Sequence, residues 1–345
     1  MPTNRRSLMK AGGLALAATL AAPSVQAGEP ARHARGLATG LTLLQVQRDG
    51  RAWLAVKLEK GIVVVADAAR LLGMQAPETM DQLLQDEDGP RLNAVVKAVL
   101  ASSRASALYL KAAPDYAPAV SRPGKIVCVG FNYLEHLNET GATLPKVPVL
   151  FCKYNNTINR HGGTIKLPTK VATKFDYEVE LVIAMGKRAT DVSEADALSY
   201  VAGYATGNDF TARDLQFETG GQFTTGKSLD QFAPLGPYLV TADQVDPTNL
   251  TIECRVNGET RQSSNTNKML FNCRQLISYI SRHITLEPGD IIFTGTPEGV
   301  IYGMPKEKQK WLVAGDKCTP SWRPGLSWGL HRVSALGIFP IYIVR

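Results

Sequence analysis

Two carboxylates stand two residues apart in the segment Phe-Asp-Tyr-Glu-Val-Glu-Leu-Val, residues 175–182. The segment is typical of a β-strand, and strand side chains alternate between two faces, so Glu178 and Glu180 would share one face. Val179, Leu181 and Ile183 would form the other, apolar face. Like charges at this spacing repel each other unless a proton or a cation compensates them. Such a pair also occurs on solvated strand faces, so the pattern alone leaves metal binding and a plain surface pair both open.

Other residues that could act with this pair follow downstream: Asp209, Arg213, Gln216 and Lys227. Lys227 also lies in residues 221–228, which fit the phosphate-loop pattern GxxxxGK[ST]. That pattern binds phosphate only between a buried strand and the N-terminus of a helix. Polar, helix-like residues precede it here, and two prolines follow it within residues 229–237. We therefore expect no nucleotide site, and Lys227 remains a candidate active-site cation.

His136 follows the strand-like run of residues 126–129, at a junction where a rigid element can present a catalytic side chain. If the chain forms a helical turn here, Glu139 would lie beside His136. A carboxylate in that place orients an imidazole and raises its basicity, as a general base requires. The alternative is a solvated His–Glu pair.

An ordered series of motifs over about residues 123–317 resembles the fumarylacetoacetate hydrolase family. The motifs occupy residues 125–136, 148–153, 176–181, 203–216, 226–230, 234–237, 256–259 and 289–297. So many motifs in one order are more specific than any one of them. The resemblance implies an α+β, β-rich catalytic domain of the mixed β-sandwich roll type, a small N-terminal domain and a homodimer.

The resemblance also implies roles for individual residues. A divalent ion, Mg²⁺ with Mn²⁺ and Ca²⁺ as alternatives, would be held by Glu178, Glu180 and Asp209. Oxygen ligands are those that a hard cation prefers. The implied catalytic residues are His136, Glu139 and Lys227. The implied substrate-binding residues are Tyr133, Arg213, Gln216 and Thr296.

The implied activity is hydrolysis of a C–C bond in a small acylpyruvate or diketo acid of the fumarylacetoacetate or fumarylpyruvate type, through a metal-bound enolate. The metal would chelate the keto-acid oxygens. His136 would deprotonate the attacking water with the help of Glu139, and Lys227 would offset the oxyanion charge. Two alternatives stay open: a decarboxylase, hydratase or isomerase of a 2-keto acid, or a periplasmic protein that binds carboxylates without turnover.

Two segments depart from the family pattern. Residues 301–311 are longer and more charged than the usual link after Gly-Thr-Pro, and residues 322–331 replace the usual acidic closing segment. Both changes could reshape the pocket or the dimer contact.

The composition, 44% hydrophobic and 20% charged, is typical of a globular protein, and the first residues are typical of an export leader. Residues 4–10 contain a twin-arginine sequence, an apolar stretch follows over residues 11–22, and a small-residue end closes at Ala27. We expect cleavage there, a periplasmic location, and no membrane span in the mature chain. Loss of the three basic leader residues lowers the formal charge from +7 to +4, which is too mild to indicate nucleic-acid binding.

After the leader of residues 1–27, we predict a small N-terminal domain over residues 28–115 and the catalytic domain over residues 116–345. Strand-like runs occupy residues 41–47, 52–58 and 62–65, a helical stretch follows near residues 92–101, and a proline-studded segment at residues 113–123 is the best linker candidate. Further helices are predicted over residues 193–203 and about 273–283.

Overall fold

Strands predominate in the computed structural model of the protein, which describes residues 34–324 and 340–344. The strands are β1 (Thr42–Arg48), β2 (Arg51–Leu58), β3 (Gly61–Val64), β4 (Tyr116–Ala117), β5 (Ile126–Gly130), β6 (Val149–Lys153), β7 (Ile158–Asn159), β8 (Thr164–Lys166), β9 (Phe175–Asp176), β10 (Val179–Met185), β11 (Val201–Asn208), β12 (Thr211–Ala212), β13 (Ala233–Thr241), β14 (Leu250–Val256), β15 (Glu259–Asn265), β16 (Ile291–Phe293), β17 (Lys317–Pro324) and β18 (Ile341–Val344). The α-helices are α1 (Val65–Leu72), α2 (Met80–Gln85), α3 (Gly89–Ala101), α4 (Leu134–Thr140), α5 (Phe223–Lys227) and α6 (Cys273–His283). This α+β, strand-rich composition confirms the predicted fold class.

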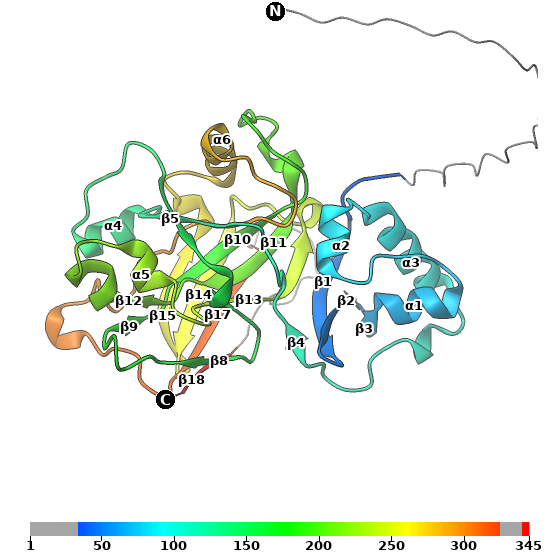
Figure 1. Ribbon diagram of the computed structural model, residues 1–345, viewed down its shortest axis with the longest axis horizontal. Coiled ribbons are helices and arrows are strands. Elements are labelled where there is room, and N and C mark those ends of the chain that lie inside the picture. Colours follow the sequence, from blue (N-terminus) through cyan, green and yellow to red (C-terminus); the bar gives the residue numbers. More distant parts are fainter. Residues whose placement is uncertain (1–33, 325–339, 345) are drawn as a thin grey trace, which may run out of the picture. The chain divides into compact units, whose positions relative to one another are not determined.

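One long sheet joins the first strands of the chain to those that carry the acidic residues. Its 11 strands follow the order β3-β2-β1-β13-β11-β10-β16-β5-β6, with β4 added to β1 and β7 added to β13. A 5-stranded sheet, in the order β15-β14-β17-β18-β8, and a small pair of β12 and β9 complete the described strands. Figure 1 shows β10 and β11 running side by side through the middle of the long sheet. Their ends, together with that of β5, carry the candidate site.

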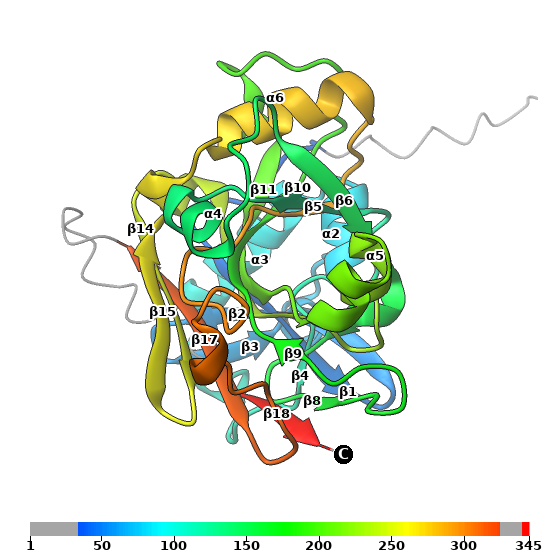
Figure 2. The ribbon, with the colours of Figure 1, turned by 90° about the vertical axis from the view of Figure 1, so that its left-hand side faces the viewer.

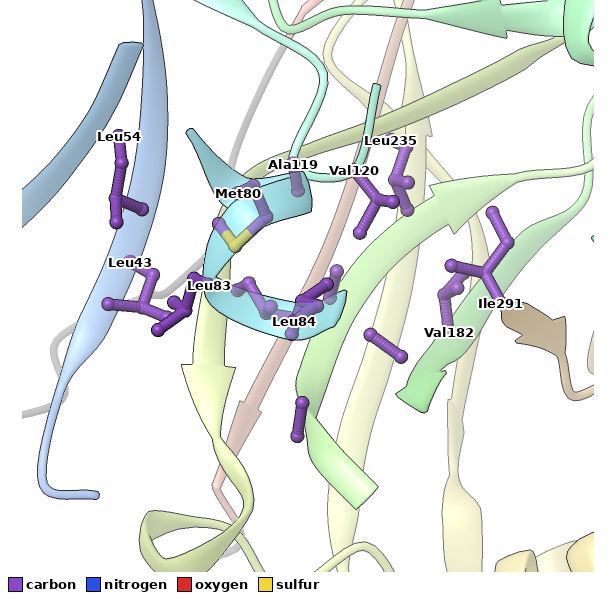
Figure 3. Packing of buried hydrophobic residues seen from close by; sticks show 14 of the residues in the cluster. Leu43, Leu54, Met80, Leu83, Leu84, Ala119, Val120, Val182, Leu235 and Ile291 are labelled. Atoms are coloured by element: carbon purple, nitrogen blue, oxygen red, sulfur yellow. The ribbon is translucent and has the colours of Figure 1, made fainter. Parts of the chain in front are cut away.

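The first hairpin belongs to the same sheet as the site. β1 pairs antiparallel with β2 and also with β13, so that Thr42 lies opposite Val240. One apolar cluster packs Leu43 of β1 and Leu83 of α2 together with Val182 of β10 (Figure 3). The three predicted strands of this region are confirmed within one residue at each end, whereas α1 and α2 were not predicted. The boundary near residue 115 stays a prediction.

One of the two later helix predictions is wrong. Between Ser193 and β11, only residues Ala197–Tyr200 form a short 3-10 turn, and Val201 already begins a fully buried strand. The Ser193–Asp196 hydrogen bonds form, but they hold a local turn. At Gly203 an added Cβ would lie 2.3 Å from the carbonyl oxygen of Val240, so the strand needs glycine to approach β13. Burial between two strands overrides the helical spacing of the apolar residues.

The other prediction is confirmed. α6 covers Cys273–His283, and a capping box formed by Asn272 and Gln275 starts it. Figure 2 shows this helix crossing one side of the fold, away from α4 and α5, which flank the ends of β5 and β10. None of the helices in the described part of the chain is long and apolar enough to cross a bilayer. The predicted leader lies outside the described residues, so export and a periplasmic location stay predictions.

Candidate metal centre and active site

The three candidate metal ligands meet where β10 and β11 pair. Val179 of β10 lies opposite Asn208 of β11, so Glu178 and Glu180 flank this pair on one strand and Asp209 follows it on the other. The backbone N–H of Asp209 also donates to the carbonyl oxygen of Glu178 at 2.8 Å. One oxygen atom from each of the three carboxylates lies within 4.8 Å of the others. The antiparallel pairing therefore brings together residues that are 31 positions apart at most in the sequence.

Two buried lysines compensate part of this negative charge. Lys227 Nζ lies 2.7 Å from Glu178 Oε2 and 2.7 Å from Asp209 Oδ2. Lys153 Nζ lies 2.6 Å from Asp209 Oδ1, and both of these side chains are fully buried. Lys227 was a sequence candidate, whereas the role of Lys153 was not recognised. A lysine at the end of the otherwise apolar run of β6 was the available signal, because a buried lysine almost always has a charged partner.

Arg213 and Gln216 join the same network from the turn after β12. Arg213 Nε donates to Asp176 Oδ2 at 2.9 Å, and its NH2 group lies 2.7 Å from Glu178 Oε1. Its NH1 group donates to Gln216 Oε1 at 3.0 Å. Burial by itself would lower the pKa of Arg213, but Asp176 and Glu178 raise it above the ordinary value. Arg213 thus stays charged and is paired with protein carboxylates. Asp176 is a further residue of the site that the sequence analysis did not single out.

The pKa values of Glu178 and Glu180 are shifted in opposite directions. Burial would raise the pKa of Glu178, but Lys227, Arg213 and His136 lower it to about 2. For Glu180, burial and the neighbouring carboxylates Asp209 and Glu178 all raise the pKa well above the ordinary value. Among the described residues Glu180 forms no ion pair with a lysine or arginine, and Oε2 accepts only a backbone N–H, that of Gly295, at 2.7 Å. A divalent cation would compensate this remaining negative charge, so the donor set fits one.

The predicted His–Glu pair is present on α4. His136 Nδ1 lies 2.8 Å from Glu139 Oε1, as expected for side chains three residues apart on a helical turn. A carboxylate at Nδ1 holds the proton there and leaves Nε2 as the acceptor, which is the tautomer that a general base needs. His136 is buried, and the Phe131 ring stacks against it with ring centroids 6.4 Å apart. The pair is therefore a fixed element of the interior, and the alternative of a solvated pair does not apply.

A pocket opens over these groups. Its polar lining consists of His136, Thr140, Glu178, Glu180, Arg213, Gln216, Lys227 and Thr296. Its apolar lining is mainly four partly exposed phenylalanines, Phe131, Phe151, Phe217 and Phe223, of which the first three all contact Phe223 edge to face. Charged groups that can bind and polarise a small acid thus share one pocket with an aromatic wall.

The two remaining substrate-binding candidates differ in placement. Thr296 lines the pocket, and its hydroxyl donates to the carbonyl of Val179 at 2.9 Å and accepts from Gln262 at 2.8 Å. Tyr133 is fully buried outside the pocket lining, and its hydroxyl has no hydrogen-bond partner among the described residues. Burial raises the pKa of Tyr133 well above its ordinary value. A contact between Tyr133 and substrate stays a prediction.

The motif that resembles a phosphate loop has another role. A helical turn, Asp214–Glu218, precedes α5, so the strand that a phosphate loop requires is not there. An added Cβ at Gly226 would lie 2.8 Å from the backbone of Gln216. Glycine therefore lets α5 pack closely on this turn and carries Lys227 into the carboxylate cluster.

Comparison with known proteins adds a family and several relatives. Residues 125–324 match the family described as fumarylacetoacetate (FAA) hydrolase C-terminal. The chain is 41% identical over 242 residues to the mitochondrial oxaloacetate tautomerase Fahd2a of Rattus norvegicus, a match that covers 70% of this chain and 75% of the relative. The solved fumarylacetoacetate hydrolase of Exiguobacterium antarcticum is 30% identical, with a TM-score of 0.71 over 88% of this chain and 99% of that one.

A second solved structure contains ligands. The fumarylpyruvate hydrolase of Pseudomonas aeruginosa, solved with Mn²⁺ and pyruvate, is 33% identical to the chain and has a TM-score of 0.54. The match covers 64% of this chain and 90% of that one.

Proposed function

The chain belongs to the fumarylacetoacetate hydrolase family, and from this premise we propose that it is a metal-dependent enzyme that transfers a proton at the carbon beside the keto group of a small 2-keto acid. The observation that carries the proposal is one pocket lined by both the His136 base and the buried carboxylates Glu178 and Glu180. The name of the rat relative, oxaloacetate tautomerase, supports this reaction class. The Mn²⁺ and pyruvate of the Pseudomonas relative support a divalent ion and a keto-acid ligand.

Metal binding, proton transfer and charge compensation would fall to different residues of the chain. Glu178, Glu180 and Asp209 would hold the divalent ion, which supplies Lewis-acid stabilisation of an enolate when bound. His136 Nε2 would take a proton from C3 of the keto acid and return it to the keto oxygen, so keto and enol forms interconvert without gain or loss of atoms. Lys227, whose pKa is raised by Asp209 and Glu178 in spite of its burial, stays protonated and offsets negative charge near that oxygen.

Hydrolysis of an acylpyruvate is the second candidate, and it is the reaction that the sequence favoured. The hydrogen bond between His136 and Glu139 supports it, because an oriented imidazole can deprotonate a water molecule as well as a carbon acid. Water then adds to the distal carbonyl and the C–C bond breaks, which yields pyruvate and a carboxylic acid. Tautomerisation ranks first because the relative named for it is 41% identical and covers 70% of this chain, whereas the fumarylpyruvate hydrolase is 33% identical and covers 64%.

A panel of 2-keto acids tests both candidates. Oxaloacetate, acetylpyruvate and fumarylpyruvate would be incubated in D₂O with the enzyme and Mn²⁺ or Mg²⁺. Exchange of the C3 hydrogens above the enzyme-free rate, followed by NMR, reports proton transfer. Release of pyruvate from acetylpyruvate or fumarylpyruvate reports hydrolysis, whereas release of pyruvate from oxaloacetate reports decarboxylation. We expect exchange to stop in chelator and in His136→Ala. Exchange that persists in chelator would remove the metal from the proposal, and binding without exchange or product would support a carboxylate-binding protein instead.

We also propose that the mature protein acts in the periplasm, as a homodimer. The twin arginines at residues 5 and 6 and the small-residue end at Ala27 support export. Cell fractionation and light scattering of the purified mature protein test the two statements separately.

A further inference from the structure

The loop after β16 contacts Glu139 directly. The backbone N–H of Gly299 donates to Glu139 Oε2 at 2.9 Å, while Oε1 of the same carboxylate lies 2.8 Å from His136 Nδ1. The two oxygens therefore hold two different elements, the loop and the imidazole. A carboxylate fixed at both oxygens has one orientation, and the imidazole that it contacts has one tautomer.

Gly303, at the other end of this loop, packs against the same side chain. An added Cβ would lie 2.5 Å from both Cγ and Cδ of Glu139, and 2.7 Å from Oε2. Gly303 does not have a positive φ, so its backbone conformation is open to alanine. Close approach to Glu139 is thus the reason for glycine at this position, and alanine would act on Glu139 rather than on the backbone.

Asp176 holds the middle of the loop by hydrogen bonds. This fully buried carboxylate accepts the backbone N–H groups of Ile301 at 2.9 Å and Tyr302 at 3.0 Å. The same side chain accepts from Arg213 Nε, and Arg213 in turn contacts Glu178. One buried carboxylate therefore anchors both the loop that contacts the histidine pair and the arginine that contacts the carboxylate cluster.

We propose that residues 299–303 form a positioning loop for the His136 base, and that Gly303 is the residue of this loop that fixes the position of the Glu139 carboxylate. The proposal rests on the role of His136 in the proposed function. A side chain at position 303 displaces the Glu139 carboxylate and breaks its bonds to Gly299 and His136. His136 then loses its fixed tautomer, while the metal-binding carboxylates, which Gly303 does not contact, keep their places.

A double-mutant cycle tests this route. Gly303→Ala, Glu139→Gln and the double variant would be compared for kcat, KM and Mn²⁺ affinity. Because general-base orientation is at stake, we expect Gly303→Ala to lower kcat about 10–100-fold with KM and Mn²⁺ affinity nearly unchanged. The double variant should be no slower than the slower single variant. Gly36→Ala is the matched control, because a Cβ there meets Pro90 at 3.7 Å, which is ordinary contact.

The outcomes separate this inference from the proposed function. Wild-type activity in Glu139→Gln would remove the histidine pair from the proposed mechanism. A slow Glu139→Gln beside a fast Gly303→Ala, or additive losses in the double variant, would overturn the positioning loop alone.

Folding itself offers a second test. If Gly303→Ala does not fold, the variant Gly303→Ala/Glu139→Ala should fold again, because it removes the side chain that the new Cβ would meet. A double variant that remains unfolded would overturn the proposal.

Discussion

Lys153 offers a test of how the carboxylate cluster is balanced. Lys153→Met would keep the length and apolar stem of the side chain but remove its ammonium group. Asp209 Oδ1 would lose its partner at 2.6 Å, and the carbonyl oxygen of Phe210 would lose one at 3.2 Å. Asp209 would retain only the contact of Oδ2 with Lys227. The change therefore leaves part of a buried negative charge uncompensated.

The size of the effect follows from burial. Both Lys153 and Asp209 have no exposed side-chain surface, and removal of one partner from a buried ion pair costs about 3–5 kcal/mol. Methionine fills nearly the same volume, so the cavity contribution is small. At about 2 °C per kcal/mol for a chain of this size, the melting temperature should fall by about 6–10 °C. A bound divalent ion places new positive charge beside Asp209, so the loss should shrink in saturating Mn²⁺.

Thermal and denaturant unfolding of wild type and variant, in EDTA and in excess Mn²⁺, measure the loss of stability and its dependence on the ion. Lys125→Met is the matched control. Its ammonium lies 2.6 Å from the buried Asp290 Oδ2, but the lysine side chain is 35% exposed and the carboxylate keeps the backbone N–H groups of Lys125 and Glu287, so this loss should be smaller than that of Lys153→Met. If Lys153→Met costs no more than Lys125→Met, the charge of the cluster does not depend on Lys153. An equal loss in EDTA and in Mn²⁺ would show that Asp209 does not face the ion.

Two further predictions concern the site, and one concerns the leader. Because its pKa is raised, Glu180 keeps its proton in the metal-free folded chain at pH values where the unfolded chain has lost it, above about pH 4.3. The stability of the metal-free protein should therefore fall as the pH rises above that value. Mn²⁺ binding in that window should release about one proton, which calorimetry in two buffers of different ionisation enthalpy detects; identical heats would contradict it. Arg213 and Lys227 already pair with protein carboxylates, so Phe223→Arg would add a cation to the aromatic wall that can bind the distal carboxylate of a substrate. Oxaloacetate has such a carboxylate and acetylpyruvate does not, so the ratio of their kcat/KM values should rise about tenfold, roughly 1.4 kcal/mol. An unchanged ratio would show that the distal group does not reach Phe223. Replacement of both Arg5 and Arg6 by lysine should leave the protein in the cytoplasm, and continued periplasmic recovery would argue against the twin-arginine route.

The sequence predicted the parts of the site that depend on local order. Glu178 and Glu180 belong to one strand-like segment, and the motif order linked them to Asp209 before the structure placed the three together. Lys153 and Asp176 could not be assigned in the same way, because their roles arise from contacts between distant segments. A charged residue at the end of an apolar strand indicates burial with a charged partner, but the sequence does not identify that partner.

The same distinction explains the errors in the fold. α6 was predicted correctly because its cap and its apolar stripe are local signals. Residues 193–203 carry a local turn and helical spacing as well, but the pairing of β11 with β10 and β13 decides their structure. The contacts of the loop after β16 with Glu139 likewise depend on elements about 160 residues apart.

The pairing of β1 with β13 has a consequence for the order in which the protein can fold during synthesis. Leu41 donates its backbone N–H to Thr241, 200 residues later in the chain. At ribosomal rates of about 5–20 residues per second, β1 would wait about 10–40 s for this neighbour. Until then one edge of the first hairpin has unpaired backbone groups, which invite wrong strand pairing. The nascent chain should therefore require chaperone protection at least until β13 has been synthesised, because the amino-terminal hairpin cannot complete this edge before then.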